Sequence, residues 1–117
     1  MKIKLVLVIA LVGLFMNSCG TLTSTTAIDA NNSFVLGNNQ HGTFSVRLKN
    51  ISQGDIEVHR APIDGGRHSF ETIKPGQTIK VKVEKNTALV IDNKSNRVAS
   101  VELFVKGDTG LSMGYKN

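Results

Sequence analysis

Apolar and polar residues alternate along most of the chain after residue 32, with the period of two that marks strands with one buried and one solvated face. The clearest example is the segment 79–83, where Ile79, Val81 and Val83 enclose Lys80 and Lys82. The same alternation recurs in the other apolar segments, and it predicts strands near 33–36, 43–49, 55–60, 67–73, 78–84, 87–92, 97–105 and 110–116.

Turn-forming residues separate these segments at intervals of about ten residues, which is typical of antiparallel sandwiches and barrels. Pro75-Gly76 suits the centre of a type II turn, because proline restricts φ and glycine accepts the positive φ that follows. No segment after residue 32 shows helical periodicity. The pattern therefore predicts an all-β fold, a single antiparallel β-sandwich of seven or eight strands, and leaves the strand order open.

Two segments, VRLKN at 46–50 and IKPGQTIKVKV at 73–83, resemble immunoglobulin-like and fibronectin-like modules of bacterial envelope proteins. In those modules an asparagine ends an early strand and a Pro-Gly turn opens a later one. The resemblance implies an immunoglobulin-like strand arrangement for the sandwich. It carries no functional residue.

The first eighteen residues have the organisation of an export signal. Lys2 and Lys4 precede an uninterrupted apolar run from Leu5 to Met16, which is shorter than the roughly 20 residues that a membrane-spanning helix needs. The following segment 21–32 is rich in Thr, Ser and Asn, and we interpret it as a flexible tether. The expected organisation is a signal peptide at 1–18, a tether at 19–32 and a sandwich domain at 33–117.

The end of the apolar run, Met16-Asn17-Ser18-Cys19, resembles the lipobox of bacterial lipoproteins, in which an aliphatic residue and two small residues precede a cysteine. The resemblance implies diacylglycerol transfer to the sulfur of Cys19, cleavage before Cys19 and acylation of the new amino group. Gly20, where inner-membrane lipoproteins tend to carry Asp, implies the outer membrane of the cell envelope, with the leaflet left open. Two or more acyl chains give a lasting membrane anchor.

The net charge of the chain limits the classes of partner that the domain is expected to bind. The chain has 14 Lys and Arg against 9 Asp and Glu, and removal of Lys2 and Lys4 leaves 12 against 9, a formal +3 that is too small for a nucleic-acid footprint. Several basic residues occupy outward positions of the predicted strands and turns, namely Arg47, Lys49, Lys74, Lys80, Lys82, Lys85, Arg97 and Lys106. If their strands are neighbours, Arg47, Lys49, Lys80 and Lys82 form a patch for anionic lipopolysaccharide, lipid headgroups or an acidic partner. The alternative is a solvated face whose lysines discourage edge-to-edge strand pairing.

Motifs for catalysis or metal binding do not emerge from the sequence. His41, His59 and His68 lie in separate segments without the close spacing of zinc motifs, and we interpret them as surface or rim histidines. The sequence also contains no nucleophile elbow of the G-x-S-x-G type. We expect no enzyme, metal or cofactor, and favour a non-catalytic interaction or structural module that docks an envelope protein or anionic glycan. The alternatives are a small-ligand or metal-binding lipoprotein using the three histidines, and a hydrolase on an unrecognised scaffold.

Overall fold

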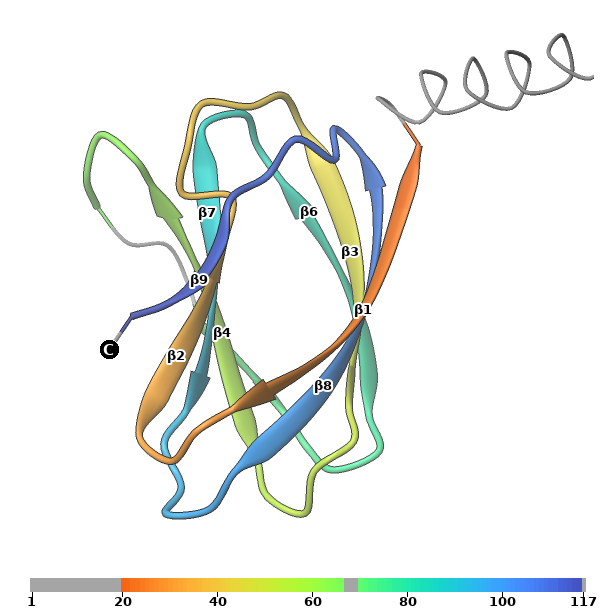
Figure 1. Ribbon diagram of the computed structural model, residues 1–117, viewed down its shortest axis with the longest axis vertical. Helices are drawn as coiled ribbons and strands as arrows, with labels where there is room; N and C mark the ends of the chain where they lie inside the picture. Colours follow the sequence, from red (N-terminus) through yellow and green to blue (C-terminus); the bar gives the residue numbers. More distant parts are fainter. Residues whose placement is uncertain (1–19, 67–69, 117) are drawn as a thin grey trace, which may run out of the picture.

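Antiparallel strands account for the regular structure of the protein in a computed structural model that describes residues 20–66 and 70–116 (Figure 1). The nine strands in these residues are β1 (Thr21–Ile28), β2 (Asn32–Leu36), β3 (Phe44–Asn50), β4 (Ile56–Pro62), β5 (Phe70–Ile73), β6 (Thr78–Val83), β7 (Thr87–Asn93), β8 (Ala99–Gly107) and β9 (Met113–Tyr115). Within these residues no helix is long and apolar enough to cross a membrane. The predicted signal peptide and Cys19 lie outside the described residues.

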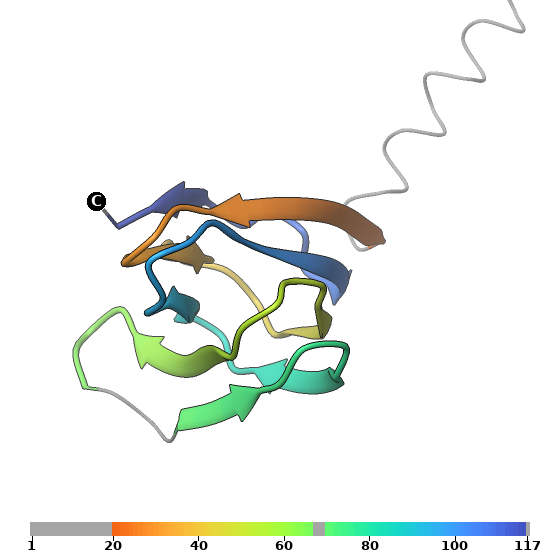
Figure 2. The same cartoon turned by 90° about the horizontal axis from the view of Figure 1, so that it is seen from below.

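The strands form a four-stranded sheet in the order β1-β8-β3-β6 and a five-stranded sheet in the order β5-β4-β7-β2-β9. Figures 1 and 2 show the two sheets packed face to face. The first eight strands pair as a nested antiparallel hairpin, β1 with β8, β2 with β7, β3 with β6 and β4 with β5. A doubled chain that wraps in this way is a jelly roll, also called a double-stranded β-helix.

This order confirms the predicted all-β sandwich and replaces the immunoglobulin-like arrangement. In an immunoglobulin domain the first strand pairs with the second, whereas here β1 pairs with β8. Only β4 and β5 are both consecutive and hydrogen-bonded among the described strands. Each of the eight predicted strands overlaps one of β2 to β9.

The expectation of a flexible tether at 19–32 is wrong for residues 21–28, because they form strand β1. Residues 21–28 pair with β8 along their whole length, from Thr21 opposite Lys106 to Ile28 opposite Ala99. The alternation was hidden because two inward positions hold hydroxyl side chains, Ser24 and Thr26, which bond to each other at 2.8 Å. The four β-branched threonines of this segment favour a strand over a tether, and they were the signal that could have identified it.

The space between the sheets is filled by aliphatic side chains. Val46 on β3 lies opposite Val81 on β6 and Val105 on β8, and all three are buried. Leu36, Leu89 and other inward residues of the second sheet close the same core. The predicted inward face of the segment 79–83 is therefore confirmed.

Four chain crossings between the sheets lie at one end of the sandwich, which we call the crossover end; Figure 2 shows the molecule from this side. Two of the crossings, β3 to β4 and β7 to β8, begin with the same buried asparagine arrangement. The Nδ2 of Asn93 donates to the carbonyl oxygens of Ile28, Asp29 and Arg97 at 2.9, 3.1 and 2.7 Å. Its Oδ1 accepts from the backbone N–H and hydroxyl of Ser95.

Asn50 repeats this arrangement in the first half of the jelly roll. Its Nδ2 donates to the carbonyl oxygens of Gly54 and Ile73, and its Oδ1 accepts from the N–H and hydroxyl of Ser52. Asn50 and Asn93 are 0% and 1% exposed. Each asparagine thus ties one crossing to a strand of the other half, Asn50 to the end of β5 and Asn93 to the end of β1.

The opposite end, which we call the N-terminal end because β1 begins there, is held together by hydrogen bonds between loops. Asp108 accepts the N–H groups of Gly42 at 2.6 Å and Gly110 at 2.8 Å. These two N–H donors, Gly42 first, lower the pKa of the Asp108 carboxyl, because they stabilise its charged form. The loops 37–43 and 108–112 are therefore joined through one carboxylate.

The turn between β5 and β6 confirms the predicted role of Pro75-Gly76. The N–H of Gln77 donates to the carbonyl of Lys74 at 2.9 Å, and Gly76 has a φ of 82°. This is the geometry of a type II turn, in which the third residue needs positive φ.

We expect Asn93→Ala to destabilise the domain by about 2–4 kcal/mol, because it leaves buried carbonyl oxygens at the crossover end without their donor. Urea unfolding measures the change, and Asn96→Ala, at an exposed position of the same loop, is the matched control. A midpoint for Asn93→Ala equal to that of Asn96→Ala would show that the asparagine does not hold this corner.

We expect Asp108→Asn to remove part of the acid sensitivity of the fold. A lowered pKa in the folded state means that the carboxylate stabilises the fold above its unfolded pKa of about 3.9, and that this stabilisation is lost as the pH falls through the folded value. Wild type should exceed the variant in stability at pH 7, and the difference should shrink as the pH falls through the lowered folded-state pKa of Asp108. Urea midpoints across this range provide the measurement, with Asp64→Asn as control; a constant difference at all pH values would contradict the assignment.

Candidate functional site

The outer face of the four-stranded sheet carries five of the six basic residues that lie in the described strands. Strand register arranges its side chains in rows across β1, β8, β3 and β6. The rows read Thr21, Lys106, Ser45 and Lys82; then Thr23, Phe104, Arg47 and Lys80; then Thr25, Glu102, Lys49 and Thr78. We call this surface the basic face.

Strand pairing brings the four residues of the predicted patch together. Strands β3 and β6 are neighbours, and Arg47 lies directly opposite Lys80. Lys49 is two residues further along β3, and Lys82 is opposite Ser45. The condition that the sequence left open, that these strands be adjacent, is therefore met.

The other basic residues that the sequence singled out are divided between the basic face and the loops. Lys106 joins the patch through β8, which pairs with β3. Lys74, Lys85 and Arg97 lie in loops outside the strands of either sheet. Sequence reasoning missed Phe104 and the threonines of β1 as parts of this surface, although both occupy outward positions of a period-two pattern.

Charge is strongly segregated over the molecule. The basic face holds five of the eleven basic residues in the described segments and one of the nine acids, a formal +4. The rest of the described chain holds six basic residues and eight acids. The net charge of the described residues therefore comes from this one face, which attracts anions while the remaining surface does not.

The basic face is hollowed where its lysines converge. A depression of about 580 Å³ is lined by Lys80, Lys82, Lys106, Ser45 and neighbouring backbone. The guanidinium of Arg47 lies over the ring of Phe104, 5.6 Å from its centroid, so the aromatic ring supports the cation. Three ammonium groups around a shallow hollow suit phosphate, sulfate or carboxylate groups that remain partly solvated.

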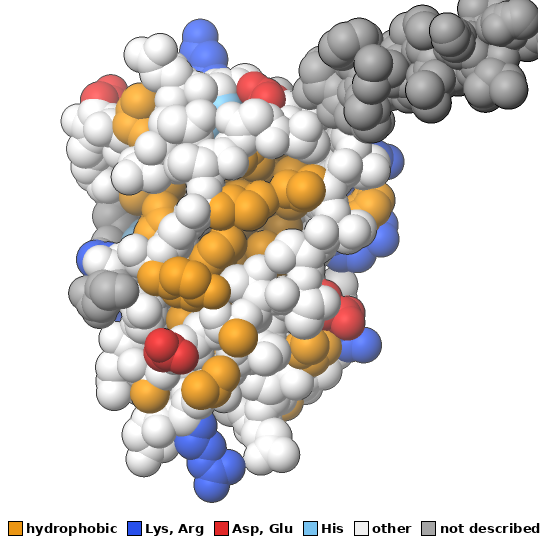
Figure 3. All heavy atoms as spheres, viewed as in Figure 1, with side chains coloured by type: hydrophobic (Ala, Val, Ile, Leu, Met, Phe, Trp, Pro, Cys, Tyr) orange, Lys and Arg blue, Asp and Glu red, His pale blue; other side chains and the backbone are white. Residues whose placement is uncertain are grey.

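Figure 3 shows the molecule in the orientation of Figure 1. Lysine and arginine side chains project along the right-hand margin, on the side where Figure 1 places β1, β3, β6 and β8. An apolar band runs across the front, between β9 and β1. Tyr115 of β9 connects the two sheets beside this apolar band. Its hydroxyl donates to the carbonyl of Ala27 on β1 at 2.7 Å, and its ring packs edge-to-face on Phe34 of β2.

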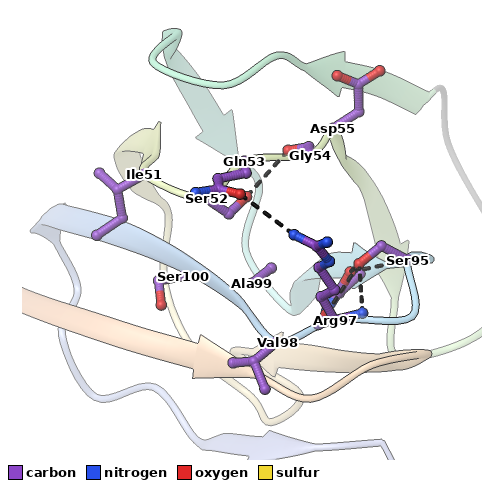
Figure 4. Close-up of a pocket in the computed structure, with 11 residues that line it drawn as sticks. Ile51, Ser52, Gln53, Gly54, Asp55, Ser95, Arg97, Val98, Ala99 and Ser100 are labelled. Carbon is purple, nitrogen blue, oxygen red and sulfur yellow. Dashed lines mark hydrogen bonds between the residues drawn. The ribbon is translucent and has the colours of Figure 1, made fainter.

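A second hollow, of about 500 Å³, lies at the crossover end between the β3–β4 and β7–β8 loops (Figure 4). The hydroxyl groups of Ser52 and Ser95 that line it already bond to Asn50 and Asn93. Arg97 reaches across to Gln53 at 3.4 Å. Since these polar groups serve the two turns, this hollow is a consequence of the repeated corner and is a weaker candidate than the basic face.

Both described histidines are buried, so neither is an exposed surface residue, although His41 does lie at the rim of the sandwich, in a loop at its N-terminal end. His41 is 9% exposed, and its ring nitrogens contact the carbonyl oxygens of Gly42 and Thr87 at 2.5 and 2.9 Å. His59 is 4% exposed on the outer side of the five-stranded sheet, with Nδ1 3.4 Å from the carboxylate of Asp92. Neighbouring side chains on that sheet cover it, including Phe70, whose ring lies edge-to-face at 5.4 Å. His68 lies outside the described residues.

Within the described segments, no three His, Cys, Asp or Glu residues are placed to hold a metal ion together. His41 belongs to a loop at the N-terminal end, where its ring packs edge-to-face on Phe44, and His59 lies on the outside of a sheet, so the two occupy different parts of the fold. A site inside the barrel would need polar groups there, and the inward positions of the described strands are mostly aliphatic, apart from the paired hydroxyl groups of Ser24 and Thr26 on β1.

Neither a known family model nor any curated protein matches the sequence. Among solved structures the chain is similar to a conserved protein with a double-stranded β-helix domain from Klebsiella pneumoniae, with 10% identity, a TM-score of 0.56 and coverage of 82% of this chain and 76% of that one. It is also similar to the cupin domain of an XRE-family transcriptional regulator from Enterobacter cloacae, with 16% identity, a TM-score of 0.54 and coverage of 77% and 84%.

A third similar structure is the capsular polysaccharide assembling protein CapF from Staphylococcus aureus, with 14% identity and a TM-score of 0.57. The match covers 75% of this chain and only 24% of CapF. At these identities the three likenesses describe the fold alone. They agree with the strand order in assigning a jelly-roll fold, the double-stranded β-helix.

Proposed function

We propose that the chain is the precursor of a lipid-anchored lipoprotein of the bacterial cell envelope, placed in the outer membrane by its Gly20, and that its domain is a non-catalytic module that binds anionic groups through the basic face. The single observation that carries the binding role is the segregation of charge, +4 on one sheet face against an excess of acids elsewhere in the described residues. The anchor rests on the export-signal pattern and the chain's one cysteine, Cys19.

The packed interior supports a role for the outer surface. In a jelly roll a ligand can lie inside the barrel or against it, and here the inward positions of the paired strands carry aliphatic side chains such as Leu48, Val83 and Leu103. A binding function is left to the exterior, where the lysine-lined hollow on the basic face offers anion contacts. The partner chemistry that fits is a surface of phosphate, sulfate or carboxylate groups.

The anchor is tested by Cys19→Ser. We expect this variant to lose labelling with a fatty-acid analogue and to accumulate as the uncleaved precursor, because the acceptor sulfur is gone. Ser18→Ala, which keeps a small residue before the cysteine, is the control and should be labelled and processed. Continued labelling of Cys19→Ser, or a natural mature form whose mass contains no acyl chain, would refute the anchor.

The basic face is tested by neutralising three of its charges, Arg47→Gln, Lys80→Gln and Lys82→Gln together. Exposed ion pairs contribute about 0.2–1 kcal/mol each, so we expect the loss of three to lower the affinity for heparin by about three- to 150-fold. The matched control, which removes three exposed charges elsewhere, is Lys74→Gln, Lys94→Gln and Lys116→Gln.

Both triple variants of the purified lipidated protein are compared by the salt concentration that elutes them from immobilised heparin. We expect the basic-face variant to elute at lower salt than the control variant, with equal thermal midpoints. Equal elution of the two variants would mean that net charge alone, and not this surface, sets the attraction.

A further inference from the structure

The fold begins almost at the proposed anchor. The carbonyl of Gly20 already accepts the N–H of Gly107 at 3.3 Å, and β1 starts at Thr21. Two residues of extended chain span at most about 7 Å. A lipid on Cys19 would therefore hold the start of β1 close to the membrane surface, with no tether to move the domain away from it.

One of the two rows of the basic face that carry two basic residues lies at the same end of the sheet as this start. Thr21 is opposite Lys106, and the row continues through Ser45 to Lys82. Adjacent strands are about 4.8 Å apart, so the row extends about 14 Å from Thr21 across the sheet. Charge interactions in physiological salt decay over about 8 Å, and only a domain held this close would feel the field of the headgroups.

Charge also decides which surface turns toward an anionic membrane. The loops at the N-terminal end carry Asp64, Glu84 and Asp108 against Lys85 among their described residues, so anionic headgroups repel that end. The adjoining basic face carries a formal +4 and attracts them. A domain attached at Thr21 is expected to tilt until the face, rather than the end, meets the headgroups.

The face has side chains suited to headgroup contact. Thr21, Thr23 and Thr25 are exposed along β1, beside the lysine-lined hollow of β3, β6 and β8. Hydroxyl and ammonium donors side by side match the phosphate and glycerol oxygens of phospholipids.

We propose that the domain lies on the membrane that holds its own anchor, with the basic face against the phosphates of anionic phospholipid headgroups. This inference rests on the proposed lipidation of Cys19 and names the partner of the basic face. An anionic glycan, which would bind away from the membrane, is the competing occupant.

The experiment uses the native lipidated protein in vesicles of phosphatidylcholine, with or without 30% phosphatidylglycerol. Because Cys19 carries the lipid, a cysteine introduced elsewhere is the single free thiol of the chain. A fluorophore is attached at Thr23→Cys on the basic face, or at Thr72→Cys, an exposed residue of β5 on the other sheet. Protection from a water-soluble quencher reports which surface meets the membrane.

We expect protection at position 23 in phosphatidylglycerol vesicles, its loss in pure phosphatidylcholine or at 0.5 M salt, and no protection at position 72. Each basic residue near an anionic surface contributes about five-fold to the attraction, so the Arg47, Lys80 and Lys82 triple variant should weaken it about 100-fold and lose the protection. The Lys74, Lys94 and Lys116 triple variant should keep it.

The proposed membrane orientation can be refuted by results that leave the proposed function intact. Equal exposure of position 23 in both vesicle types, or protection that survives in the basic-face variant, overturns the membrane orientation while leaving anchor and anion binding intact. Protection at position 23 by soluble heparin but not by phosphatidylglycerol assigns the face to a glycan and overturns the inference as well. Protein that carries no lipid refutes the anchor itself in the labelling experiment.

Discussion

The crossings of the chain between two sheets impose the constraint on which the rest of this structure depends. Each crossing at the crossover end takes backbone carbonyl groups out of the strand ladders next to an aliphatic core, where an unpaired polar group is costly. Asn50 and Asn93 resolve this constraint by donating to carbonyls of their own loop and of a strand from the other half of the chain. Asn93 thereby holds the end of β1, 65 residues earlier in the chain.

The space between the described sheets is filled mainly by aliphatic side chains, so the outside of the sheets is the candidate binding surface. The similar jelly rolls differ from this chain at more than four positions in five, so their roles do not transfer, and its own residues must carry the argument. Those residues separate charge by position: five cations share one sheet face, while acids predominate over the rest of the described surface. A modest net charge conceals this separation, because opposite charges on different faces cancel in the sum.

The same strand that completes the four-stranded sheet also removes the spacer between the fold and Cys19. Residues 21–28 pair fully with β8 and are not free to act as a flexible linker. If Cys19 is lipidated, the domain is confined to the membrane surface by its own hydrogen bonding. Its orientation there would follow from charge, since the described residues of the loops near Thr21 have a net negative charge and the neighbouring basic face has a net positive one.

Local patterns in the sequence determined the strands β2 to β9, the turn at Pro75-Gly76 and the outward positions of Arg47, Lys49, Lys80 and Lys82. These features depend on side-chain alternation and on the φ preferences of single residues, which are readable from neighbours in the chain. The alternation of apolar and polar residues did not predict strand β1, because Ser24 and Thr26 hold inward positions at the sheet edge, where hydroxyl groups can bond to each other.

Only the tertiary structure decided the strand order, the burial of His41 and His59, and the joining of the basic residues into one face. All but one of the described strand pairs connect strands that are not consecutive, so their register depends on how the doubled chain wraps. Arg47 and Lys80 are 33 residues apart in the chain and become neighbours solely through the pairing of β3 with β6. Such long-range pairing is set by burial of the whole apolar face at once, a collective property that no local segment contains.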